Sequence, residues 1–340
     1  MKMKTWMKDA LGGLAIGTGI LPGVSVGTIG MIVDVYDKLI NSMSKLTKEF
    51  KKSVLTLIPI GGGCLLSTFL LMLFWKKLAY PYFPFPIICA LAGIVAGSLP
   101  ICAAPLKGVK LNAGDIARMI IAFIITAAIG IFSFLAAAGV INLQIDLGGA
   151  MDAPFQNAWI FAIVFLVGFI ASVACLIPGI SGSMVMFIFG LYNPIIGLFI
   201  STRAEDGSIL HPSIFSDIGN TPYFWGGVVI IIVLLIGMLI GFVSASKAMA
   251  SLMVKHRVGT FTVVIGFIIG SIVSMFFNND THAIYTNPRL NVWWQYLIGG
   301  VLFVGFAILL FVVVSKKLKQ KEEVELQHLE ENLEKPAESE

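Results

Sequence analysis

The sequence predicts an all-α polytopic membrane protein built from two inverted repeats, each a re-entrant helical hairpin followed by three transmembrane helices. Three observations support this fold class. The 340 residues have a mean hydropathy of +0.93, and only 12% of them are charged, about half the share in a soluble domain. Six apolar stretches are long enough to cross a bilayer, which takes about 20 residues. Two further apolar regions are interrupted near the middle by Pro-Gly and a serine.

The first repeat is predicted over residues 1–140. It opens with a hairpin at 4–40, whose break reads Leu21-Pro22-Gly23-Val24-Ser25. Such a break leaves backbone groups without helical partners at membrane depth, and this is tolerated only where protein or a wet cavity satisfies them. We therefore interpret the segment as two arms that enter and leave on one side. Three full helices follow, at residues 53–75, 87–105 and 116–140.

An external linker at 141–157 leads to the second repeat, predicted over residues 158–314. Its hairpin at 158–200 breaks at Ile177-Pro178-Gly179-Ile180-Ser181. Its full helices are expected at 223–243, 260–277 and 293–314, before a charged tail at 315–340. An offset of 156 residues places the breaks in register and pairs Pro22 with Pro178, Gly23 with Gly179, Ser25 with Ser181 and Tyr36 with Tyr192. Because three crossings separate the hairpins, the halves are expected to have opposite topology, as in transporters whose site lies at the repeat interface.

Small residues recur in the second full helix of each half. The pattern Gly-x-x-x-Gly-Ser occurs at 93–98 and again at 266–271. In membrane helices such residues let two backbones approach closely. We expect them to mark tight helix contacts.

Basic residues indicate the orientation. If the N-terminus is cytoplasmic and each hairpin returns to the side it entered from, all but four of the 23 Lys and Arg residues lie on the cytoplasmic side. The exceptions are Lys76, Lys77, Arg203 and Arg289. This asymmetry satisfies the positive-inside rule and predicts that both termini are cytoplasmic. The basic residues lie singly or in short groups between apolar runs, a pattern unlike a nucleic-acid surface.

The breaks predict an anion site. After each break a half-helix should begin inside the membrane, at about Val26 and Gly182. Its first N–H groups lack partners and carry the positive end of the helix dipole. Glycines would let a ligand approach the backbone, and hydroxyls suit anion contact. The candidate residues are Gly23, Ser25, Gly27, Thr28, Gly179, Ser181, Gly182 and Ser183.

A phosphate at this site would need further positive charge. Two half-helix ends supply roughly +1, whereas a phosphate monoester carries roughly −1.5 to −2. Arg118 adjoins the third full helix and is a candidate for the missing charge, although a lipid-interface anchor explains it equally well. Asp34 lies within an apolar run and is a candidate carrier of a coupling proton. It could equally lie at the cytoplasmic surface beside Asp37 and Lys38.

The sequence argues against catalysis and cofactors. Gly23-Val24-Ser25-Val26-Gly27 matches the nucleophile elbow of serine hydrolases, but that motif requires a preceding strand and a nearby histidine. Here the flanks are helical, and the four histidines lie in loops or in the tail. The four cysteines lie in apolar stretches without metal-site spacing. We expect neither a metal nor another cofactor.

Two segments carry a family resemblance. These are Gly17-Thr-Gly-Ile-Leu-Pro-Gly-Val-Ser-Val-Gly-Thr28 and Cys175-Leu-Ile-Pro-Gly-Ile-Ser-Gly-Ser183, followed by Phe189-Gly-Leu-Tyr-Asn-Pro194. They resemble the polyprenyl-phosphate transporter family, the translocases that return undecaprenyl phosphate to the cytoplasmic leaflet. The resemblance implies a non-enzymatic transporter of the inner membrane that recycles a lipid carrier for cell-wall synthesis. From the residues alone, a secondary transporter of a small anion or ion stays open, as does, less favoured, a membrane enzyme acting on prenyl pyrophosphate.

Overall fold

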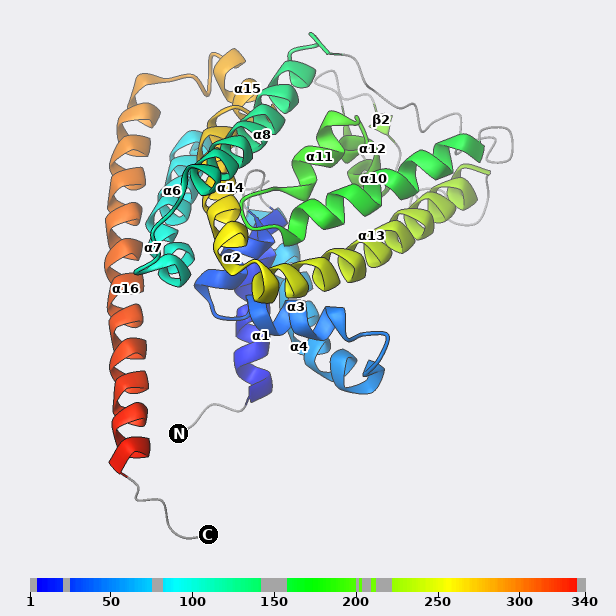
Figure 1. Cartoon of the computed structure of the whole chain (residues 1–340). Coiled ribbons are helices and arrows are strands. Elements are labelled where there is room, and N and C mark those ends of the chain that lie inside the picture. Colours follow the sequence, from blue (N-terminus) through cyan, green and yellow to red (C-terminus); the bar gives the residue numbers. More distant parts are fainter. Residues whose placement is uncertain are drawn as a thin grey trace.

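The computed structural model describes residues 5–20, 25–74, 82–141, 158–199, 202–203, 209–211 and 222–334 (Figure 1). Helices dominate this part of the chain, which confirms the predicted all-α membrane fold. Seven of the described helices are long and apolar enough to cross a membrane. Six of them correspond to the predicted full helices. The seventh, Trp159–Leu176, is the first arm of the predicted second hairpin, and its length is that of a full crossing.

The first half contains α1 (Thr5–Ile16), η1 (Gly17–Ile20), α2 (Val26–Ile32), α3 (Tyr36–Ser44), α4 (Phe50–Phe74), α6 (Pro84–Gly97), α7 (Leu99–Ala103), η3 (Ala104–Leu106) and α8 (Ala113–Ala137). The predicted helix at 87–105 is thus divided at Ser98 into α6 and α7. Pro100 lies two residues beyond this division, and a proline cannot donate the backbone hydrogen bond that would continue the helix.

The second half contains α10 (Ala158–Leu176), α11 (Gly182–Ile188), α12 (Tyr192–Phe199), α13 (Pro222–Lys255), α14 (Arg257–Phe276), α15 (Asn279–Thr286) and α16 (Trp293–Glu334). A short antiparallel pair, β1 (Thr202–Arg203) and β2 (Ile209–His211), lies between α12 and α13. Helix α16 is 42 residues long, so most of the predicted tail continues the last crossing as a helix.

Glycines bring the two halves together. Gly93 and Gly97 of α6 lie against α16, where an added Cβ would stand 2.3 Å from the Phe303 carbonyl oxygen and 2.5 Å from that of Ala307. Gly266 and Gly270 of α14 lie in the same way against the backbone of α8. The expected role of the Gly-x-x-x-Gly patterns in close helix packing is therefore confirmed.

This packing is reciprocal between the halves. The second full helix of each half, α6 or α14, packs against the third full helix of the other half, α16 or α8. Within each half, the first hairpin arm packs against the helix that follows the hairpin, α1 on α4 and α10 on α13. Related halves would pack in this way, although the inverted relation itself stays a prediction.

Figure 1 shows which connections share a side of the protein. The start of α1, the end of α16 and the connection between α3 and α4 lie at the lower side of the view. Helix α15 and the end of α8 lie at the opposite side. The two described ends of the chain therefore lie on the same side.

Candidate functional site

Each predicted half-helix begins where the sequence places it. Helix α2 starts at Val26 and α11 at Gly182, and each runs for seven residues. The residue before each is a serine in an extended conformation, with φ −95° and ψ 129° at Ser25 and φ −99° and ψ 120° at Ser181. Both half-helices and both serines obey the 156-residue offset. Gly23 lies outside the described residues.

Hydrogen bonds join the first half-helix directly to the second break. The Gly179 N–H donates to the Thr28 hydroxyl at 2.9 Å, and the Ser25 hydroxyl donates to the Ile177 carbonyl oxygen at 3.1 Å. The Tyr36 hydroxyl donates to the Leu176 carbonyl oxygen at 3.0 Å. Side chains of the first half thus satisfy backbone groups that the end of α10 leaves without helical partners.

Apart from Ser25, which donates to Ile177, the hydroxyls at the breaks retain donor capacity. Thr28 is 1% exposed and accepts from Gly179, a bond that does not use the proton of its own O–H. The hydroxyls of Ser181 and Ser183 lie 2.8 Å apart, and one proton suffices for that bond. Neither Ser25 nor Ser181 caps its half-helix with its side chain. The site therefore combines hydroxyl protons with helix N–H groups, which is the chemistry that binds an anion.

The glycines at the breaks lie against backbone. Gly179 has a φ of +92°, which glycine adopts without a steric penalty, and an added Cβ would stand 2.4 Å from the Phe267 carbonyl carbon of α14. A Cβ on Gly27 would stand 2.8 Å from the Leu176 carbonyl oxygen, and one on Gly182 would stand 2.4 Å from that of Ala171. These positions need glycine for packing, and headgroup contact with them stays a prediction.

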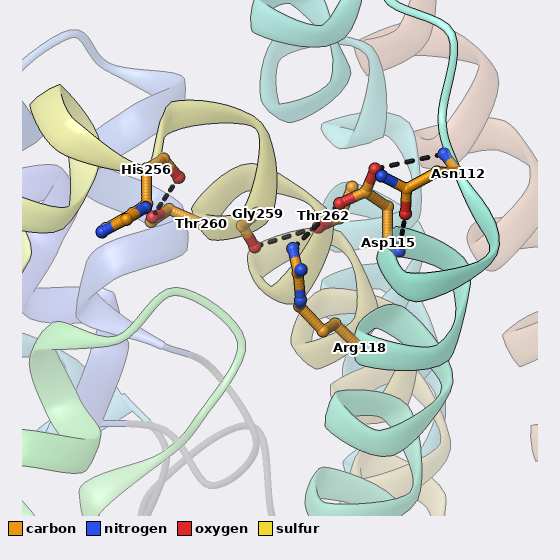
Figure 2. A network of polar contacts seen from close by, with 7 residues as sticks. All are labelled: Asn112, Asp115, Arg118, His256, Gly259, Thr260 and Thr262. Atoms are coloured by element: carbon orange, nitrogen blue, oxygen red, sulfur yellow. Dashed lines mark hydrogen bonds and ion pairs between the residues drawn. The ribbon is translucent and has the colours of Figure 1, made fainter.

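Arg118 lies in a polar network at the start of α8 (Figure 2). Asn112 and Asp115 cap this helix reciprocally, with the Asp115 N–H donating to Asn112 Oδ1 at 2.8 Å and the Asn112 N–H donating to Asp115 Oδ2 at 3.1 Å. Arg118 Nη1 then donates to Asp115 Oδ1 at 2.9 Å. Asp115 is buried, whereas the Arg118 side chain is 54% exposed. The guanidinium extends toward Gly259 at the start of α14 (Figure 2).

The network is separate from the breaks. Gly179 packs on α14 at Phe267 and Ile268, whereas Arg118 lies beside Gly259 of the same helix. At 1.5 Å per residue, these levels are about 13 Å apart along the helix axis. Among the described residues, the structure therefore brings Ser25, Thr28 and Gly179 together but leaves Arg118 nearer the helix ends.

Asp34 lies in the turn between α2 and α3, at the surface of the protein. Its side chain is 45% exposed and forms an ion pair with Lys317 of α16. The carboxylate is therefore exposed on the protein rather than buried between helices, and its depth in the membrane stays a prediction. Proton transfer by Asp34 stays a prediction.

The sequence did not predict a partly buried ion pair in the first hairpin, whose Lys38 side chain is 37% exposed. Lys38 Nζ lies 2.6 Å from both carboxylate oxygens of Asp9, whose side chain is 10% exposed. The pair joins α1 to α3. The sequence carried a signal for it, because Asp9 shares the spacing of one helix face with Gly12, Gly13 and Ile16, and the structure shows that these four are the buried residues of α1.

Most of the chain is similar in sequence to known proteins. A family model described as undecaprenyl phosphate translocase-like matches residues 16–292. The chain is 24% identical over 288 residues to a protein of Vibrio cholerae named polyprenyl-phosphate transporter, covering 80% of this chain and 78% of that protein. It is 27% identical over 310 residues to a Staphylococcus aureus protein of the same name, covering 91% of this chain and 96% of that protein. No solved structure matches the chain.

Proposed function

Because the chain belongs to the undecaprenyl phosphate translocase-like family, we propose that it moves undecaprenyl phosphate, or a similar polyprenyl phosphate, between the two leaflets of a membrane. The two relatives named polyprenyl-phosphate transporter support this substrate. The observation that carries the proposal is the contact of the first half-helix with the second break, at Thr28 and Gly179.

In this proposal the phosphate binds at the breaks while the prenyl chain stays among the lipid tails. The buried hydroxyls of Ser25, Thr28 and Ser181 support the assignment, since each lies where a half-helix begins or where one break meets the other. The starts of α2 and α11 would add their N–H groups. Gly23, Gly27, Gly179, Gly182 and Ser183 complete the proposed site.

We assign to two sources the positive charge that the half-helix ends do not supply to the phosphate. Arg118 would meet the headgroup near the ends of α8 and α14, because its place beside Gly259 is about 13 Å from the level of Gly179 on α14. A translocated cation or proton would supply the rest, with Asp34 as the candidate proton carrier. An uncompensated buried anion would cost several kcal/mol, so some counter-charge is required.

The protein is proposed to work in the cytoplasmic membrane as a transporter without catalytic activity, with both termini in the cytoplasm. The distribution of Lys and Arg supports this orientation. The start of α1 and the end of α16 lie on the same side of the protein, which is consistent with this orientation (Figure 1). The transported lipid carrier would return to the cytoplasmic leaflet for cell-wall synthesis.

A binding measurement on the purified protein tests the proposed site. Undecaprenyl phosphate, a short-chain prenyl phosphate and inorganic phosphate are compared as ligands of the wild type and of the double variant Ser181→Ala/Ser183→Ala. We expect binding of the long-chain lipid, weakened at least tenfold in the variant, because a hydrogen bond to a charged group contributes about 1.5–3 kcal/mol. Ser98→Ala is the matched control, since Ser98 is buried and donates to Val95 of α6, away from the breaks. Equal binding of inorganic phosphate would instead favour a transporter of small anions.

A further inference from the structure

The two half-helices end in the same kind of turn. The Val35 N–H donates to the Gly30 carbonyl oxygen at 2.9 Å, and the Leu191 N–H donates to that of Met186 at 3.0 Å. These bonds are again related by the 156-residue offset. In each turn the residue before the donor has a left-handed backbone, with φ +58° at Asp34 and +68° at Gly190. Both half-helices therefore end in a Schellman-type cap, a motif in which this residue is usually glycine.

Asp34 is the residue that departs from this rule. Glycine adopts the left-handed conformation freely, whereas a residue with a Cβ does so at an energetic cost. Within the described residues, Asp34 is the one non-glycine residue with a positive φ. A strained backbone of this kind persists where another interaction supports it, and it directs attention to what the side chain does.

The Asp34 carboxylate links the first hairpin to the last helix of the second half. It forms an ion pair with Lys317 of α16, and the two side chains are 45% and 42% exposed. Just before the turn, Met31 of α2 contacts the Cys102 thiol of α7 at a sulfur–sulfur distance of 3.8 Å. The ion pair thus lies at the rim of an apolar contact between the hairpin and the helices that pack with α16.

The second hairpin has no charged equivalent in the sequence. Its turn carries Gly190, and the helix that corresponds to α16 in the first half is α8. Residues 134–141, at the end of α8, carry no charged side chain. The link is therefore a feature of the first hairpin that the second hairpin does not share.

We propose that the Asp34–Lys317 ion pair is a latch that holds the first hairpin against α16 and opens when the hairpin moves away. The turn is joined to the first break by α2, whose seven residues span about 10 Å as a rigid helix. Movement at Asp34 is thereby transmitted to Ser25 and Thr28 at the other end of α2. This proposal goes beyond the transported substrate, because it concerns which conformation the protein holds when no ligand is bound.

An exposed ion pair contributes little free energy, so the latch shifts the equilibrium between two conformations and does not lock either one. Pairs of this exposure change an equilibrium about two- to fivefold. They are also weakened by salt, because the Debye length falls to about 3 Å at 1 M. A salt-sensitive change of this size is what the latch predicts.

A distance measurement tests the latch without any substrate. Spin labels are placed by Asn41→Cys on α3 and Gln320→Cys on α16, both exposed positions, in a background that lacks the four native cysteines. The labelled protein is studied in lipid nanodiscs. We expect Asp34→Asn and Lys317→Gln each to raise the longer-distance population about two- to fivefold, with no further increase in the double variant. High salt should reproduce this change in the wild type and have little effect on Asp34→Asn.

Two controls separate the latch from a purely structural role. Asp34→Gly removes both the carboxylate and the backbone strain, so it should raise the longer-distance population while unfolding at a higher temperature than Asp34→Asn. Lys316→Gln removes a neighbouring exposed charge and should leave the distances unchanged. Unchanged distances in both single variants would overturn the latch, as would an equal shift in Lys316→Gln or an additive effect in the double variant. These results do not depend on the identity of the transported lipid.

Discussion

The backbone N–H of Gly179 donates a 2.9 Å hydrogen bond to the hydroxyl of Thr28, residues that are far apart in the sequence and belong to different halves of the chain. The contact is buried, and Gly27 packs beside it against Leu176 and Pro178. The end of α10 is thus completed by the start of α2. The second break is therefore not satisfied by its own half alone.

Replacing Thr28 by valine should destabilise the protein. Valine keeps the shape but leaves the Gly179 N–H without its acceptor, which costs about 1–3 kcal/mol for a buried group. Thr28→Ser retains the hydroxyl and is the matched control. Thermal unfolding in detergent should show a lower midpoint for the valine variant. Equal midpoints for the two variants would mean that this bond does not hold the breaks together.

Replacing Arg118 by glutamine should weaken lipid-phosphate binding at every pH. Because the Arg118 charge is half exposed, we expect its removal to reduce the affinity for the lipid phosphate about two- to fivefold. Asp115→Asn is the informative comparison, because it disturbs the cap of α8 while leaving the cation in place. We expect that variant to lose about 1 kcal/mol of stability but to keep binding. Wild-type affinity in Arg118→Gln would remove this residue from the site.

The pH dependence of transport tests whether Asp34 carries the coupling proton. If its carboxylate carries the coupling proton, Asp34→Asn should flatten the dependence of transport on an imposed pH gradient, whereas Lys317→Gln should retain that dependence. If the carboxylate acts only through its ion pair, the two variants should behave alike at every pH. Transport into liposomes with and without the gradient distinguishes these outcomes. An unchanged pH profile in Asp34→Asn would exclude Asp34 as the carrier.

The orientation is tested by labelling single cysteines in intact cells. Thr47 lies in the connection between α3 and α4, and Arg289 lies between α15 and α16, and both are exposed. The distribution of basic residues predicts that Arg289→Cys reacts with an impermeant reagent from outside, whereas Thr47→Cys reacts only after permeabilisation. Reaction of both from the same side would contradict the predicted topology. Ser208, another position on the predicted outer side, lies outside the described residues.

Local chemistry explains what the sequence could predict. A proline followed by glycine and serine disfavours a continuing helix, so the break at Pro178 predicted the end of α10, and the residues after the two breaks predicted the starts of α2 and α11. The ion-pair partner of Arg118 could also be predicted from the sequence. Asn112-x-x-Asp115 before an apolar run is a capping pattern, and Asp115 and Arg118 are three residues apart on one helix face.

Tertiary contacts explain what the sequence could not predict. The sequence left open whether Asp34 lies deep in the first hairpin or at the cytoplasmic surface. The left-handed turn after α2 ends the half-helix and places the carboxylate at an exposed position beside Lys317. Lys317 is distant in the sequence, and no local pattern joins the two. The same is true of the bond between Thr28 and Gly179, which depends on how the halves pack.

Leaflet exchange in proteoliposomes tests the central claim most directly. Undecaprenyl phosphate is placed in the outer leaflet, and the fraction that becomes protected from an external phosphatase is followed over time. The proposed function predicts that wild-type protein accelerates this protection, that Ser181→Ala/Ser183→Ala slows it strongly and that Ser98→Ala does not. A rate no faster than in protein-free liposomes, from protein that is folded and inserted, would contradict the claim that this chain transports a polyprenyl phosphate.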